Sequence, residues 1–234
     1  EHLREYPSLN VADIDVAEAA ADAAERATRL LGAQQPSSGT VTLVLEPRMA
    51  ATLLSVIGGT LDGESVLKGR SPFAERVGEQ IASPLLTLVD DPTDPASLGA
   101  DSHDGEGLAT RRIALIEDGV LRGFLHNTAT GRRAGVPSTA SAVRGYRSTP
   151  GVGAQALAVA LGSGTLDELV AGVDHGILVQ SMNGLHSGVN AISGDFSVGV
   201  EGLMVRDGAL AEPIRAIVRQ KGATPRATWA RRRR

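Results

Sequence analysis

The stretch FSVGVEGLMVRDGALAEPIRAIV, residues 196–218, decides the fold class. Two runs rich in Val, Ile and Leu flank Asp207-Gly208, and Asp-Gly between two such runs is the signal of a type I′ turn. The stretch therefore predicts a β-hairpin with strands at residues 196–205 and 209–218. Its long strands make this hairpin the natural centre of a sheet.

A second Asp-Gly pair, Asp118-Gly119, lies between two apolar runs and predicts another hairpin. Two capping-box patterns, at Asp15 and Thr165, and a proline at a first helical position mark helix starts. The sum is an α+β fold, in which a largely antiparallel sheet dominates the second half and a few helices are peripheral. The expected strands are 40–45, 85–89, 113–116, 120–125, 155–161 and 177–182, and the expected helices are 16–31, 47–57, 71–81, 128–134 and 166–171.

The composition is that of a soluble globular protein. Of 234 residues, 42% are hydrophobic, 21% are charged and only 3% are aromatic, so the core is built from Val, Leu, Ile and Ala. The absence of cysteine excludes a disulfide framework, an iron–sulfur cluster, a thiolate zinc site and a cysteine nucleophile. Neither a membrane-length apolar run nor a signal-peptide pattern is visible, so we expect a cytoplasmic protein that does not contact a membrane.

The charge is divided unevenly along the chain. Seven of the 23 basic residues and none of the 27 acidic residues lie from Arg219 onward, so the first 218 residues carry a net charge of −11. An acidic body disfavours a nucleic-acid surface. The four arginines of residues 231–234 could bind phosphate, but a solvated and disordered tail over residues 219–234 is the simpler prediction.

The common catalytic motifs are missing. A helical zinc site needs two histidines one turn apart, and no two of the five histidines lie within five residues of each other. A nucleophile elbow and a phosphate-binding loop are also absent. On these grounds no catalytic residue, metal ligand or cofactor is assigned to this chain. The histidines are His2, His103, His126, His175 and His186.

A long acidic loop, residues 90–107, is the first candidate site, because loops of this length are usually functional or disordered. Its six carboxylates could bind a hard cation, although they lack the spacing of a calcium loop. Asp104 and Glu106 lie on a Gly-rich turn shortly before Arg112. This arrangement suits a buried ion pair or an edge that docks a polypeptide. Asp104, Glu106 and Arg112 are therefore candidate contacts to a substrate or partner.

Two further candidates lie near the long hairpin. His186 stands between Gly184 and Gly188, where the backbone can closely approach a ligand, and it is the best candidate for a substrate contact. Asp195 stands at the start of a strand, where it either caps a turn or faces a ligand.

Seven segments together resemble the TldD/PmbA (TldE) family of metallopeptidases. They follow the family's order across about residues 8–218, and their residues are more similar to those of the PmbA/TldE type. They are EPR at 46–48, LDGESV at 61–66, RSPFAERVGEQ at 70–80, LVDDP at 88–92, DGEG at 104–107 with TRR at 110–112, EDGVLRGFL at 117–125 and SGDFSVGVEG at 193–202.

The resemblance implies a role in a two-subunit peptidase. In that family a catalytic TldD-type subunit resembles a zinc metallopeptidase, with a His-Glu-x-x-x-His helix and a C-terminal cysteine as ligands. It pairs with a PmbA/TldE-type subunit that lacks the metal motif, and the pair degrades or trims unfolded peptides. This chain has neither motif. The resemblance therefore implies that zinc binds only in a catalytic partner subunit, and that this chain is a non-catalytic subunit or a fragment of one.

The resemblance also implies the domain organisation. Residues 1–35 are expected to be the helical end of a middle α/β domain, residues 36–218 the β-rich C-terminal domain, and residues 219–234 a basic tail in place of the family's last strands. A sheet without its last strands has an unpaired edge, which could add a peptide or partner strand. Two alternatives stay open: a self-contained metal-dependent hydrolase, and a gyrase-associated or nucleic-acid-binding module.

Overall fold

The computed structural model describes residues 14–220, except residues 161 and 191 and the side chain of His186. The helices are α1 (Val16–Arg29), α2 (Pro47–Gly58), α3 (Gly63–Leu67), α4 (Thr128–Ala134), α5 (Leu166–Ala171) and α6 (Leu185–Gly188). The strands are β1 (Thr42–Leu45), β2 (Leu88–Asp90), β3 (Ile113–Glu117), β4 (Val120–Leu121), β5 (Ala142–Val143), β6 (Gly151–Val152), β7 (Leu157–Val159), β8 (His175–Asn183), β9 (Val189–Asn190), β10 (Asp195–Arg206) and β11 (Ala209–Gln220).

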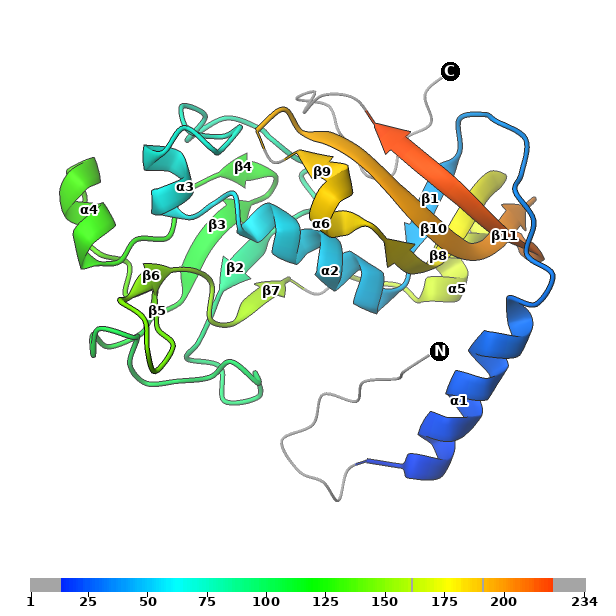
Figure 1. Ribbon diagram of the computed structural model, residues 1–234, viewed down its shortest axis with the longest axis horizontal. Coiled ribbons are helices and arrows are strands. Elements are labelled where there is room, and N and C mark those ends of the chain that lie inside the picture. The colour runs from blue at the N-terminus through cyan, green and yellow to red at the C-terminus, as the bar shows by residue number, and fades with distance from the viewer. Residues whose placement is uncertain (1–13, 161, 191, 221–234) are drawn as a thin grey trace.

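The strands form two main sheets that lie at opposite ends of the molecule (Figure 1). The larger sheet has the order β1-β8-β10-β11, with β9 beside β10, and all of its pairs are antiparallel except β1 with β8. The smaller sheet has the order β4-β3-β2-β7 and is antiparallel throughout. A separate two-stranded hairpin, β5-β6, lies beyond it. The α+β, largely antiparallel class predicted from the sequence is confirmed.

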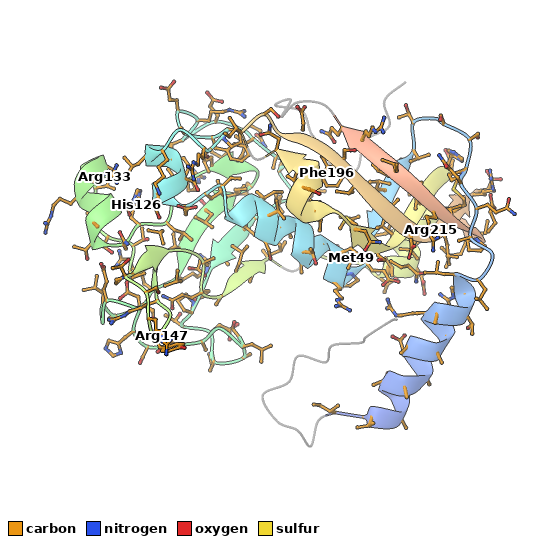
Figure 2. The ribbon with its side chains drawn as sticks, viewed as in Figure 1. Met49, His126, Arg133, Arg147, Phe196 and Arg215 are labelled. Atoms are coloured by element: carbon orange, nitrogen blue, oxygen red, sulfur yellow. The ribbon has the colours of Figure 1, made fainter. Side chains whose placement is uncertain are left out.

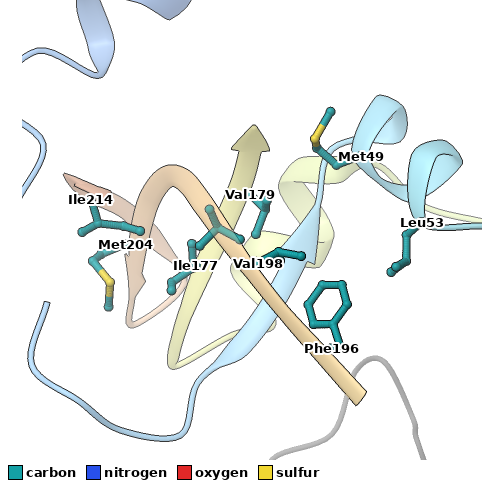
Figure 3. Close-up of a cluster of buried hydrophobic side chains, with 9 residues drawn as sticks. Met49, Leu53, Ile177, Val179, Phe196, Val198, Met204 and Ile214 are labelled. Atoms are coloured by element: carbon teal, nitrogen blue, oxygen red, sulfur yellow. The ribbon is translucent and has the colours of Figure 1, made fainter. Parts of the chain in front are cut away.

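Helix α2 joins the two hydrophobic cores. Met49 and Leu53 on one side of α2 pack against buried valines and isoleucines of the larger sheet (Figure 3). Leu54 and Ile57 on another side pack against the core of the smaller sheet. This division follows from helix geometry, because residues three or four apart share a face while neighbours diverge. The opposite face of the larger sheet is covered by α5, through Val170.

Both Asp-Gly turns have the geometry that their sequence predicts. A type I′ turn needs positive φ at both central residues. Asp207 and Gly208 have φ of 49° and 77°, and Asp118 and Gly119 have φ of 50° and 77°. The long hairpin is paired from Phe196 with Gln220 to its turn, so the strands continue slightly beyond the predicted ends.

Residues 71–81 are not the predicted helix. The N–H of Gly78 donates to the carbonyl of Leu121 at 2.8 Å, and the N–H of Leu121 donates to the carbonyl of Glu79 at 3.0 Å. The segment thus runs along β4 and uses its backbone groups there, so tertiary pairing overrides the local helix signal.

Three other predicted boundaries were wrong. The predicted strand at 120–125 is ordered as a strand only over Val120–Leu121, because the following backbone turns toward α3 and donates from Leu125 to the carbonyl of Leu61 at 3.0 Å. The acidic loop begins after Asp90, which belongs to β2. Strand β11 reaches Gln220, so Arg219 and Gln220 are part of the sheet and not of a basic tail; residues 221–234 lie outside the described part.

Helix α1 lies apart from the sheets (Figure 1) and has no buried residue. It is tied to the body by the Arg26 guanidinium, which bonds the carboxylate of Glu46 at 2.5 Å. Glu46 is 6% exposed and also accepts from the Gln180 amide at 2.7 Å. In the part of the chain that is described, no helix is long and apolar enough to cross a membrane.

Candidate functional site

Asp104 is a buried structural carboxylate, 7% exposed. One of its oxygens accepts from the N–H groups of Glu106 and Leu108, both at 2.9 Å. The other accepts from the N–H of Ala142 in β5 at 3.1 Å. These bonds fold the acidic turn onto itself and attach it to the β5-β6 hairpin. Since both oxygens already accept backbone donors, Asp104 is not aimed at a ligand.

Glu106 and Arg112 also have partners within the smaller lobe, by which we mean the smaller sheet with the helices and loops around it; the larger lobe is the larger sheet with its surroundings. One carboxylate oxygen of Glu106 accepts from the N–H and the hydroxyl of Thr128, at 2.9 and 2.7 Å. Arg112 lies 3.7 Å from the carboxylate of Asp91, and its side chain is 53% exposed. An exposed pair at this distance contributes little to stability. The predicted buried ion pair between the acidic turn and Arg112 is therefore wrong, since Arg112 is exposed and the acids bind backbone groups.

Sequence reasoning missed two buried titratable groups in this lobe. Asp90 is 2% exposed and accepts from the N–H groups of Gln155 and Ala156 at 3.0 and 2.7 Å. Burial raises the pKa of Asp90, although these two bonds oppose the shift. His126 is 6% exposed, and burial lowers its pKa below the ordinary value of 6.5, against the opposing charge of Asp62. Asp90 lies in β2, whereas His126 lies between β4 and α4, and burial is the first cause of the shift in both cases.

His126 gives the fold a predicted pH dependence. Because the pKa of His126 is lower in the folded state, the unfolded chain takes up a proton first as the pH falls. The stability that is linked to neutral His126 is therefore fully present above about pH 6.5, and it is lost as the pH falls toward the lower pKa of the folded state. Urea midpoints at successive pH values between 7.5 and 5 measure this. In His126→Gln the decrease between pH 7 and 5.5 should be smaller; an unchanged slope would assign it to other groups.

A hollow of about 780 Å³ in the described part of the chain lies where α6, β9, the start of β10 and the end of β11 meet. The two candidates from the sequence that lie near the larger sheet, His186 and Asp195, belong to α6 and to the start of β10. Asp195 lines the hollow, whereas the side chain of His186 is outside the described part. The lining residues are Arg70, Ser187, Gly188, Val189, Asn190, Ile192, Asp195, Phe196, Ser197, Arg219 and Gln220.

The hollow combines an apolar floor with two cations. Phe196 belongs to the core of the larger sheet, in one cluster with Met49 of α2 (both labelled in Figure 2), while Ile192 is 59% exposed. Arg70 and Arg219 both line the hollow, and neither forms an ion pair with a described residue. The sequence motifs gave no signal for this pair, since the two arginines are 149 positions apart and only the fold brings them to one cavity.

The outer edge of β11 leads toward the same hollow. Gln34 pairs with it near Ile214, donating to the carbonyl of Pro213 at 3.3 Å and accepting from the N–H of Arg215 at 3.0 Å. By the two-residue alternation of a strand, the backbone groups of Ile217 and Arg219 point the same way. Among described residues only Gln34 pairs with this edge. The geometry can receive an extended chain there.

The described residues do not fit a zinc ion. No group of three His, Cys, Asp or Glu side chains that could hold a metal occurs among them. Asp104 and Glu106 are bonded to backbone donors in one lobe, and Asp195 lies in the other. The candidates therefore do not converge on a single centre.

The chain matches known proteins over most of its length. The sequence profile described as the PmbA/TldA metallopeptidase C-terminal domain matches residues 38–222. The Metalloprotease TldD homolog of Haemophilus influenzae is 30% identical over 208 residues, covering 88% of this chain and 42% of that protein. The Metalloprotease PmbA of Escherichia coli O157:H7 is 27% identical over 199 residues, covering 84% of this chain and 41% of that protein.

The solved structures agree with the sequence matches. The crystal structure of TldE from Thermococcus kodakarensis aligns with a TM-score of 0.82 and 29% identity, covering 89% of this chain and 48% of that one. The chain thus spans less than half the length of these relatives. The chain belongs to the PmbA/TldD family of metallopeptidases, and residues 38–222 match the C-terminal domain of that family.

Proposed function

We propose that this chain is the C-terminal part of a non-catalytic, PmbA/TldE-type subunit that assists a TldD-type catalytic subunit in trimming unfolded peptides. The observation that carries the proposal is how the loop carboxylates are used. Asp104 and Glu106 are bound to backbone groups of their own lobe, and the sequence has neither a cysteine nor a close histidine pair to replace them. A zinc centre and its activated water would therefore belong to the catalytic partner.

The contribution of this chain to such a pair would be substrate enclosure. An extended peptide could pair with the outer edge of β11 through its main chain, which suits substrates of varied sequence. Where the edge reaches the hollow, Arg70 and Arg219 could bind a carboxylate of the peptide, because charge-assisted bonds from arginine are strong and directional. The exposed Ile192 would contact apolar side chains.

The test is zinc content and cleavage of an unstructured peptide, with the chain alone and then mixed with a TldD-type subunit. We expect the chain alone to be zinc-free and inert, and the mixture to cleave at a rate that differs from that of the catalytic subunit alone. Arg70→Gln with Arg219→Gln should raise the KM of the mixture for acidic peptides about tenfold. Arg206→Gln, on the far turn of the same sheet, is the matched control.

Other outcomes would identify other functions. Stoichiometric zinc with activity of the chain alone would support a self-contained hydrolase and contradict the proposal. Salt-dependent DNA binding that disappears when residues 231–234 are deleted would assign that binding to the arginine tail. The expected cytoplasmic location is tested separately, by fractionation of the cells that make the protein.

A further inference from the structure

Glu46 and Gln180 form a buried polar cluster at the point where β1 ends and α2 begins. The Glu46 side chain is 8% exposed, and one of its carboxylate oxygens accepts from the Gln180 amide at 2.7 Å. The backbone of Glu46 is fixed as well. Its N–H donates to the carbonyl of Val179 at 3.2 Å, and its carbonyl accepts from the N–H of Ala50 at 2.9 Å. A carboxylate that is held in one place and removed from water is a strong partner for a cation.

Gln180 is a bulge residue whose side chain reaches Glu46. Its two neighbours in β8 pair with the consecutive residues Glu201 and Gly202 of β10, so Gln180 is the extra residue at this register shift. Because a carboxylate only accepts hydrogen bonds, the nitrogen of the Gln180 amide faces Glu46, and the amide oxygen is left over. This oxygen is buried and receives no hydrogen bond from a described residue.

The cation that this cluster holds is Arg26 of α1. Its guanidinium divides its donors, since Nη1 bonds Glu46 at 2.5 Å while Nε bonds Asp22 of the same helix at 2.8 Å. No donor of Arg26 reaches the oxygen of Gln180. A buried acceptor without a donor is costly, so this occupant satisfies the cluster only in part.

Helix α1 can leave this contact without uncovering a hydrophobic core. None of its residues is buried, and none belongs to the hydrophobic clusters of the described residues. Figure 1 shows α1 apart from both sheets. A helix of 14 residues is marginal in water when nothing packs against it, so a released α1 would also lose its helical order. Its release is therefore a local event.

We infer that Glu46 and Gln180 form a recognition site for the guanidinium of an arginine in another polypeptide segment, and that Arg26 is the resident, displaceable ligand of this site. Arginine suits it because its N–H donors form a planar fork that can bond two acceptors at once. An arginine whose Nε is not used within its own helix can bond Glu46 and also supply a donor to Gln180. Its binding exchanges a partly satisfied cluster for a satisfied one and releases α1.

The experiment is a titration of the 234-residue chain, followed by NMR. The probe is acetyl-arginine amide, and the control probe is acetyl-citrulline amide, which has nearly the same shape without the charge. We expect the arginine probe to bind with a Kd on the order of 1 mM and the citrulline probe not to bind. Hydrogen exchange at the amides of α1 should become faster when the arginine probe binds, because the released helix loses its order.

Three variants of the chain make the titration specific. Arg26→Gln removes the resident ligand and should raise the affinity for the arginine probe about tenfold, since α1 no longer has to be displaced. Glu46→Gln should abolish binding. Arg29→Gln is the matched control and should bind like the wild-type chain, because Arg29 lies in the last turn of the same helix and bonds Glu25 within it. Thermal melts check the fold of each variant, and Arg26→Gln alone decides if Glu46→Gln does not fold.

Several results would overturn the inference. Equal binding of the two probes would mean that the charge is not recognised. An affinity of Arg26→Gln no higher than that of the wild-type chain would mean that Arg26 and Glu46 form a structural tie and not an occupied site. Unchanged binding in Glu46→Gln would place the probe elsewhere. No second subunit takes part in the titration, so each of these results leaves the proposed function standing.

Discussion

Replacing Gly202 with alanine is expected to destabilise the larger sheet by about 4 kcal/mol, a large part of the stability of an ordinary domain. A Cβ atom built on Gly202 would lie 1.9 Å from the carbonyl oxygen of Leu178 and 3.2 Å from the Cα of Val179. Both are backbone atoms of β8, at the register shift where β10 passes it. Since no side-chain rotation can relieve the contact, the two central strands would have to separate.

The urea midpoint of Gly202→Ala measures this effect. Gly123→Ala is the matched control, because nothing lies within 4 Å of the added Cβ and its φ is not positive. The control should change stability by less than about 1 kcal/mol, and in the stabilising direction. Equal midpoints for the two variants would mean that β8 and β10 do not approach each other as described.

Replacing Asp104 with alanine is expected to cost about 3 kcal/mol, because it leaves three backbone donors without their acceptor in a buried place. The loss should be local. Hydrogen exchange at the amides of Glu106, Leu108 and Ala142 should become faster, while exchange in the larger sheet should stay slow.

Asp104→Asn tests the same bonds more gently. It can keep the oxygen that accepts from Glu106 and Leu108, but it places an amide nitrogen against the N–H of Ala142. We expect an intermediate loss. The control is Asp101→Ala, since within the described residues the exposed Asp101 carboxylate accepts only from the N–H of His103, at 3.2 Å. Fast exchange at Ala142 in this control would contradict the assignment to Asp104.

Several elements could be predicted because their signals are local. The Asp207-Gly208 turn, the capping box at Thr165 and the proline at the start of α2 each act within a few residues. The elements at these positions formed within two residues of the expected boundaries. The predicted helix at residues 71–81 failed for the opposite reason, because its backbone groups are used by β4, about 40 positions further along the chain.

The candidate site was predictable only in part. Residue type and Gly-rich context indicated His186 and Asp195; Asp195 lines the hollow beside β10, whereas the side chain of His186 in α6 is outside the described part. The same reasoning selected Asp104 and Glu106, whose roles depend on the distant partners Ala142 and Thr128. The sequence alone does not distinguish a loop carboxylate that faces solvent from one that faces a ligand or a buried amide.

The sequence by itself determined the α+β class, the two Asp-Gly hairpins and the resemblance to the TldD/PmbA family, since these depend on local turn chemistry and on ordered motifs. Only the tertiary structure decided which charges are buried, that Arg70 and Arg219 line one hollow, and that Arg26 and Gln180 meet at Glu46. The physical reason is the range of the interactions. Turns and caps are fixed by neighbours along the chain, whereas burial and convergence are fixed by contacts between segments far apart in sequence.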